Sequence, residues 1–124
     1  MPQILVIDDD EALCGLIEYK LKQKGHNVTV GYDGQEALEL LKEKKYDILV
    51  LDIMMPKIDG FYLLREIRKS GSAAPKATIV LSARHEEEDM LKAFELGAVD
   101  YISKPFSLNV LVARIDIALK HKAT

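Results

Sequence analysis

The sequence predicts an α/β protein with a doubly wound parallel sheet, that is, a sheet with helices on both faces. Short apolar runs alternate along the chain with stretches whose apolar residues recur at helical spacing, which indicates five strand–helix units. Alternating strands and helices form parallel sheets, because each helix returns the chain to the start of the next strand. A length of 124 residues, 48% of them hydrophobic, is enough for one domain, residues 1–124, with its own core.

The first elements have clear local signals. Residues 4–7 are a continuous apolar run, which predicts a buried strand. The amphipathic stretch at 13–21 predicts a helix that ends before Gly25, since glycine is common just past helix ends. Residues 28–32 alternate between apolar and polar side chains, so we expect a half-buried strand at an edge of the sheet.

The remaining elements continue this alternation. Asp33 and Glu36 form a capping-box pattern, which predicts a helix start at Asp33. Acids cluster in the first turn of the helix that begins at Glu86, where the helix dipole favours negative charge. The predicted helices span residues 33–44, 60–69, 86–96 and 107–120. The predicted strands between them span residues 48–51, 78–81 and 100–103.

Composition and charge argue against several classes of protein. The net charge is −3, with acids and bases mixed along the chain, so we expect neither nucleic-acid binding nor membrane binding. The apolar runs are too short to cross a bilayer, and Met1 leads into the first strand without a signal peptide. The single cysteine, Cys14, excludes an internal disulfide; we expect it to pack inside a cytoplasmic protein. The histidines have no metal-ligand spacing, and we expect them all at the surface: His26, His85 and His121.

Polar residues follow the predicted strands at one end of the sheet. They are Asp8, Asp9 and Asp10 after the first strand, Asp52 after the third, Ser82 after the fourth, and Lys104 and Pro105 after the fifth. The carboxyl ends of parallel strands share one edge, where ligands bind in open α/β sheets. We therefore expect these side chains to form one site.

Asp8, Asp9 and Asp52 are the strongest sign of chemistry in this set. Converging carboxylates repel one another unless a cation joins them. Hard oxygen ligands with room for water suit Mg²⁺ or Mn²⁺, and no histidine or cysteine lies at these strand ends to favour zinc. Acids in this position can also cap helices, which is the role we expect of Asp10.

Four sequence blocks occur in order along the chain: ILVIDDDE, DILVLDIMMPKIDG, IVLSA and GAVDYISKPF. Together they resemble the signature blocks of the response-regulator receiver domain, the CheY-like domain of two-component signalling, over about residues 3–121. The resemblance implies a flavodoxin-like sheet of five strands in the order 2-1-3-4-5, with five helices. It also implies a signalling protein rather than an enzyme, which assists its own phosphotransfer and dephosphorylation.

The resemblance implies roles for the acids. Asp52 would accept a phosphoryl group from a phosphohistidine of a sensor histidine kinase or phosphotransfer protein, forming an acyl phosphate. Asp8 and Asp9 would hold Mg²⁺ together with Asp52 and the backbone carbonyl of Met54. The metal would neutralise negative charge on the transferred group.

The resemblance also implies roles for residues near the fourth and fifth strands. Lys104 would pair with one phosphoryl oxygen, and Ser82 would hydrogen-bond another. The peptide bond between Lys104 and Pro105 is expected to be cis. Tyr101 would be a switch that turns inward when Ser82 moves toward the phosphate, a reading that we favour over simple packing of a half-buried tyrosine in an edge strand.

Two further expectations concern phosphoryl lifetime and output. Family members that lose the phosphoryl group quickly carry polar or acidic residues where this chain has Met54 and Arg84, so we expect slow hydrolysis. The last two helices and the strand between them would form the output surface for a phosphorylation-dependent homodimer or a downstream effector. Asp100 and Arg114 match an ion pair found there in relatives. An apolar patch is also expected, made of Met90, Val99 and Val110.

Three alternative functions fit the residues less well. A haloacid-dehalogenase-type phosphatase needs a second aspartate as general acid and base at the position of Met54, as well as a cap domain. A flavodoxin-like cofactor carrier needs a phosphate-binding Ser/Thr/Gly loop where the acids follow the first strand. A receiver-like scaffold that has lost phosphorylation would not need all the polar residues that this chain keeps.

Overall fold

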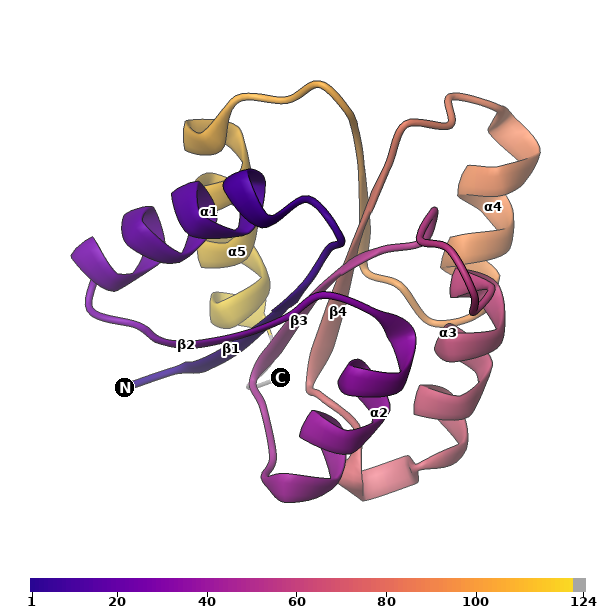
Figure 1. The fold of residues 1–124 in the computed structure, drawn as a ribbon, viewed down its shortest axis with the longest axis horizontal. Coiled ribbons are helices and arrows are strands. Elements are labelled where there is room, and N and C mark those ends of the chain that lie inside the picture. The colour runs from indigo at the N-terminus through magenta and orange to yellow at the C-terminus, as the bar shows by residue number, and fades with distance from the viewer. Residues whose placement is uncertain (122–124) are drawn as a thin grey trace.

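A parallel sheet forms the centre of the molecule (Figure 1). The structure, a computed structural model, describes residues 1–121, so the last three residues of the expected domain lie outside the description. Within this range the strands are β1 (Gln3–Ile7), β2 (Asn27–Gly31), β3 (Ile48–Asp52), β4 (Ala77–Ser82) and β5 (Asp100–Ser103). They lie in the order β2-β1-β3-β4-β5, and all neighbours are parallel. The expected fold class and strand order are confirmed.

Helices cover both faces of this sheet. In the described part of the chain they are α1 (Glu11–Gln23), α2 (Gly34–Glu43), α3 (Gly60–Lys69), the 3-10 helix η1 (Gly71–Ala73), α4 (Glu87–Glu95) and α5 (Leu108–His121). Figure 1 shows α1 and α5 on one side of the sheet and α2, α3 and α4 on the other. The ends of the predicted elements differ from these bounds by two residues or fewer. None of these helices is long and apolar enough to span a membrane.

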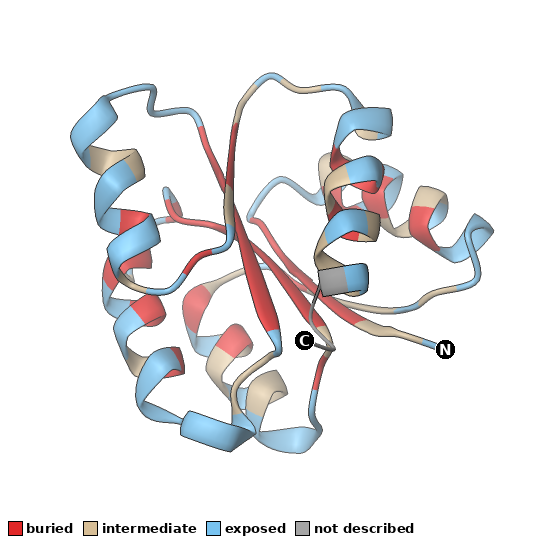
Figure 2. Ribbon diagram, turned by 180° about the vertical axis from the view of Figure 1, so that it is seen from behind, coloured by how far each residue is buried: buried red, intermediate tan, exposed pale blue. Residues whose placement is uncertain are grey.

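The strands supply side chains alternately to two apolar clusters, one on each face. In β1, Leu5 and Ile7 pack with α2, α3 and α4, whereas Ile4 and Val6 pack with α1 and α5. Every residue of β3 is buried, which explains why its sequence is apolar without alternation (Figure 2). The sheet is therefore a rigid support for the residues at its carboxyl edge.

Aspartate side chains cap the first three helices. Asp10, Asp33 and Asp59 accept hydrogen bonds from amides in the first turns of α1, α2 and α3. The capping role expected of Asp10 is confirmed, and so is the helix start expected at Asp33. α4 differs, because its N-cap residue, Glu86, makes no side-chain capping bond.

The expected surface position is wrong for His26. Its side chain is only 9% exposed, and its Nε2 lies 4.0 Å from Asp116 Oδ1 of α5. Burial here results from the packing of α5 against the end of α1, which no local pattern around a single histidine shows. His85 is exposed as expected, and the side chain of His121 lies outside the described residues.

Candidate functional site

The acids at the carboxyl ends of β1 and β3 converge. Ile7 of β1 is in register with Leu51 of β3, so the residues that follow them, Asp8 and Asp52, lie side by side. One carboxylate oxygen of each of Asp8, Asp9 and Asp52 lies within 4.8 Å of the others. Asp8 is fully buried and Asp52 is 3% exposed, whereas Asp9 faces solvent. The structure thus brings the three predicted acids together.

One lysine and two backbone amides partly offset this negative charge. Lys104 Nζ lies 2.7 Å from Asp8 Oδ2 and 3.2 Å from Asp52 Oδ2. The amide of Asp10 donates to Asp8 Oδ1 at 2.9 Å, and the amide of Met54 donates to Asp52 Oδ1 at 2.8 Å. These contacts allow two carboxylates to remain at the end of buried strands.

The pKa directions show that the offset is incomplete. Burial is the largest effect on the pKa of Asp8 and raises it, and the charge of Asp52 raises it further. Hydrogen bonds from Lys104 and Asp10 lower this pKa, but the net direction is upward. Burial lowers the pKa of Lys104, but the hydrogen bond to Asp8 and the charge of Asp52 outweigh it, so that pKa is raised. The lysine is held in its charged form, while ionised Asp8 is disfavoured. A further cation beside the acids would favour the ionised form of Asp8.

A small divalent cation fits these residues. All three acids offer hard oxygen ligands within reach of one another, and the exposure of Asp9 leaves one side open to water. This combination suits Mg²⁺ or Mn²⁺, which keep several waters when bound. Lys104 contacts both Asp8 and Asp52 and thereby holds these two carboxylates close to each other.

Ser82 and Tyr101 both contact the backbone of Arg84. Ser82, the last residue of β4, is fully buried, and its Oγ accepts a hydrogen bond from the Arg84 amide at 3.0 Å. The Tyr101 hydroxyl donates to the Arg84 carbonyl at 3.1 Å, and the tyrosine is only 6% exposed. Tyr101 therefore points inward in this structure. Sequence reasoning did not find the role of the Arg84 backbone, because bonds made by main-chain groups carry no residue-type signal.

The two methionines after Asp52 occupy different environments. Met54 is 44% exposed, and Met55 is 7% exposed and packs in the core. The peptide bond between Lys104 and Pro105 is cis. Beside Lys104 is a cavity of about 390 Å³, lined by Asp10, Leu13, Ala83, Lys104, Pro105 and Phe106.

Cys14 lies next to the site but is unsuited to nucleophilic chemistry. The thiol is fully buried and donates to the carbonyl oxygen of Asp8 at 3.2 Å. Burial, with the negative charges of Asp8 and Asp10, raises its pKa to about 12. A thiol of this kind packs rather than reacts, in agreement with the sequence.

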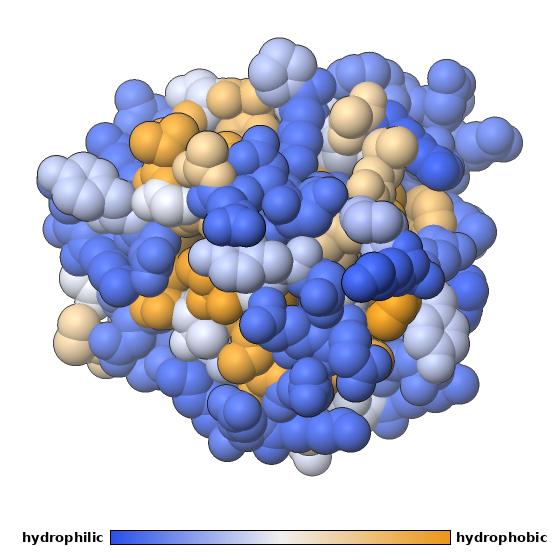
Figure 3. Space-filling model, viewed as in Figure 1, coloured by the Kyte–Doolittle hydropathy of each residue, from blue (hydrophilic) through white to orange (hydrophobic). Residues whose placement is uncertain are grey.

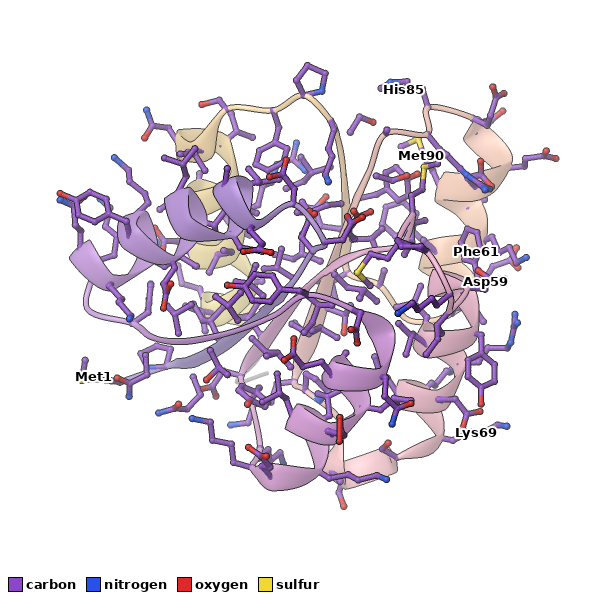
Figure 4. The ribbon with its side chains drawn as sticks, in the orientation of Figure 1. Met1, Asp59, Phe61, Lys69, His85 and Met90 are labelled. Carbon is purple, nitrogen blue, oxygen red and sulfur yellow. The ribbon has the colours of Figure 1, made fainter. Side chains whose placement is uncertain are left out.

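The structure shows where the residues expected at the output surface lie, and it corrects one of them. Arg114 of α5 contacts Asp100 of β5 at 2.7 Å within the chain. Val99 and Val110 are 55% and 43% exposed. Met90, however, is half-buried against the core, on the side of α4 below the loop that carries His85 (Figure 4). The exposed apolar residues on and beside these elements include Leu91 and Phe94 of α4 as well as Val99, Val110 and Ile117. On the face drawn in Figure 3, hydrophilic residues predominate and apolar residues form small separate groups.

Comparison with known proteins gives a consistent result. The family described as the response regulator receiver domain matches residues 4–116. The chain is similar to the receiver domain of the Francisella response regulator 1452, with 38% identity and a TM-score of 0.89 over 97% of this chain and 98% of that one. It is similar to the BeF3-activated N-terminal receiver domain of RstA from Klebsiella pneumoniae, with 30% identity and a TM-score of 0.86 over 96% and 99%. For the non-phosphorylated receiver domain of HemR from Leptospira biflexa, the identity is 31% and the TM-score 0.88 over 96% and 94%.

Proposed function

The chain belongs to the response regulator receiver domain family, and from this premise we propose that Asp52 accepts a phosphoryl group from a phosphohistidine. The donor is a sensor histidine kinase or a phosphotransfer protein, and the reaction takes place in the cytoplasm. The observation that carries the proposal is the position of Asp52. Its carboxylate is nearly buried, and it shares Lys104 with Asp8 at the edge of the sheet.

The residues around Asp52 suit it to act as a nucleophile. The Met54 amide holds Oδ1 at 2.8 Å, which leaves the carboxylate in a defined orientation. An oxygen of Asp52 attacks phosphorus, the P–N bond to the donor imidazole breaks, and that nitrogen keeps the electron pair. Mg²⁺, when bound by Asp8, Asp9 and Asp52 with the carbonyl of Met54, supplies positive charge for the transferred group.

Two further side chains bind the phosphoryl group once it is on Asp52. The charged Lys104 lies 3.2 Å from Asp52 Oδ2 and would exchange this contact for one with a phosphoryl oxygen. Ser82 accepts a hydrogen bond from the Arg84 amide, so its own hydroxyl proton remains available for a second phosphoryl oxygen. The protein assists the transfer and the later hydrolysis without turning over an external substrate.

The donor protein docks over the cavity beside Lys104. This cavity lies next to the acids and is lined partly by apolar side chains, among them Leu13 and Phe106. The output lies on the α4, β5 and α5 surface, where the Tyr101 hydroxyl contacts the Arg84 carbonyl and where Val99 and Val110 are exposed. This surface binds a second copy of the chain or an effector after phosphorylation, and the domain itself contacts neither nucleic acid nor a membrane.

Intact mass spectrometry tests the proposal. Incubation with acetyl phosphate and Mg²⁺ should add one phosphoryl group to the wild type. Asp52→Asn and addition of EDTA should each prevent the gain, because the acids need a cation before a dianion can approach. An equal gain in mass for Asp52→Asn would contradict the assignment.

A further inference from the structure

The start of α4 is held differently from the starts of the first three helices. Glu86, its N-cap residue, makes no side-chain capping bond, whereas α1, α2 and α3 each have an aspartate cap. A side chain from the preceding loop reaches the first turn instead. Arg84 Nη1 lies 3.4 Å from Asp89 Oδ1. This ion pair therefore joins the loop to a helix start that has no side-chain cap.

Arg84 also contacts the two residues that respond to phosphorylation in the proposed function. Its amide donates to Ser82 Oγ at 3.0 Å, and its carbonyl accepts from the Tyr101 hydroxyl at 3.1 Å. Arg84 thus contacts Ser82 at the site, Tyr101 in β5 and Asp89 in α4. A shift of Ser82 toward a phosphoryl oxygen moves the backbone of Arg84, which is only two residues away.

We propose that Asp89 is a positioning residue that couples the start of α4 to the phosphorylation site through the side chain of Arg84. The inference rests on the proposed function and adds the route by which α4, unlike Tyr101, receives the signal. Tyr101 responds through the carbonyl of Arg84, and α4 responds through the guanidinium group of Arg84. The two responses are therefore separable by mutation.

The surroundings of the pair support a coupling role. The Asp89 side chain is 16% exposed and the Arg84 side chain is 49% exposed, so the carboxylate is partly shielded from water. A simpler role for Asp89 is to stabilise the helix dipole as a first-turn acid. Glu88 is also a first-turn acid but is exposed, and no contact with Arg84 is found for it in the described structure. Glu88→Gln is therefore the matched control for Asp89→Asn.

Amide hydrogen exchange with and without beryllofluoride and Mg²⁺ tests the proposal. In the wild type, beryllofluoride should change the exchange rates of two sets of amides. One set lies in the first two turns of α4, and the other lies in β5. In Asp89→Asn, the α4 amides should exchange about two- to five-fold faster and no longer respond, the range expected for loss of one ion pair. The response of β5, which contains Tyr101, should remain, and Glu88→Gln should behave as the wild type.

A second variant separates coupling from a loss of folding. Arg84→Gln should reproduce the effect of Asp89→Asn at α4, and the double variant should be no worse than either single one. An α4 response in Asp89→Asn equal to that of the wild type would overturn the proposal, as would the same loss in Glu88→Gln. If the wild type itself shows no response and gains no mass with acetyl phosphate, the proposed function fails as well, and the two failures are thereby distinguished.

Discussion

Lys104 and Asp8, which are 96 positions apart in the sequence, form an ion pair of 2.7 Å at the acid cluster. The same ammonium group reaches Asp52 at 3.2 Å. Lys104 therefore provides positive charge to two carboxylates whose strands end side by side. When another cation binds the acids, the Lys104 ammonium can leave them and pair with a phosphoryl group, because both interactions use one flexible side chain.

The first prediction concerns Asp8 and pH. The pKa of Asp8 in the folded protein is raised above 3.8, its ordinary value, which is taken for the unfolded chain. At pH values between the unfolded and the folded pKa, the folded protein therefore binds more protons than the unfolded chain. Ionisation of Asp8 thus lowers stability as the pH rises through this window. Asp8→Asn removes the cost, so without Mg²⁺ its free energy of unfolding at pH 7 should exceed that of the wild type by on the order of 1 kcal/mol, or roughly 3–5 °C.

Thermal unfolding at several pH values measures this effect. The gain should shrink as the pH falls through the raised pKa of Asp8, because the carboxyl group is then protonated in the wild type. Asp10→Asn is the matched control and should change little, because asparagine also caps helices. Mg²⁺ should stabilise the wild type more than Asp8→Asn. A lower melting temperature for Asp8→Asn at pH 7 would show that the contact with Lys104 outweighs the burial cost.

The second prediction compares two glycines. A Cβ atom at Gly60, the first residue of α3, would overlap the backbone of Ile53, whereas one at Gly15 in α1 would have no neighbour within 4 Å. Gly60→Ala should therefore destabilise the protein by about 1–3 kcal/mol. Gly15→Ala should stabilise it by about 0.5–1 kcal/mol, since alanine favours a helix interior. Urea denaturation of both variants measures their free energies of unfolding. Destabilisation by Gly15→Ala would contradict the prediction.

The third prediction concerns the lifetime of the phosphoryl group. Met54 follows Asp52 by two residues, is 44% exposed, and has no polar group that could orient an attacking water. We expect slow hydrolysis in the wild type. Met54→Asn should accelerate it by up to about tenfold, which corresponds to roughly 1.4 kcal/mol of barrier. The decay of the phosphorylated mass after removal of acetyl phosphate gives the rate, with Met54→Leu as the control.

Arg84→Glu added to Met54→Asn should accelerate hydrolysis further, because a carboxylate can accept a hydrogen bond from the attacking water and arginine cannot. Arg84 also pairs with Asp89, so the single Met54→Asn variant is the cleaner measurement. A decay rate in Met54→Asn equal to or below that of the wild type would count against an effect of this residue on the approach of water.

The fourth prediction concerns self-association. Val99 is 55% exposed and lines a cavity of about 230 Å³ together with Asp100, Arg114, Ile117 and Ala118. Beryllofluoride with Mg²⁺ should increase the sedimentation coefficient of the wild type, and Val99→Asp should prevent the increase by placing charge in an apolar contact. Leu16→Asp, at a residue of α1 that is 56% exposed, is the control and should still associate. An activated wild type that stays monomeric at high concentration would exclude the homodimer.

Sequence reasoning alone was sufficient for the fold class and for the acids of the site. The alternation of short apolar runs with amphipathic stretches requires a parallel sheet, and parallel strands place their carboxyl ends at a common edge. Asp8 and Asp52 therefore had to lie near each other once the resemblance to the receiver domain implied that their strands are neighbours. The caps at Asp10 and Asp33 were predictable for a similar reason, because a cap depends on residues only three positions away.

Tertiary structure alone decided the contacts that join distant elements. The burial of His26 beside Asp116, the pairing of Lys104 with Asp8, and the bond from Tyr101 to the carbonyl of Arg84 each link segments that no periodicity relates. Local sequence signals report only which face of an element is apolar and where it begins or ends. Which side chain meets which across the sheet depends on helix packing and loop conformation. Those are properties of the whole folded chain, because each helix finds its position only against its neighbours.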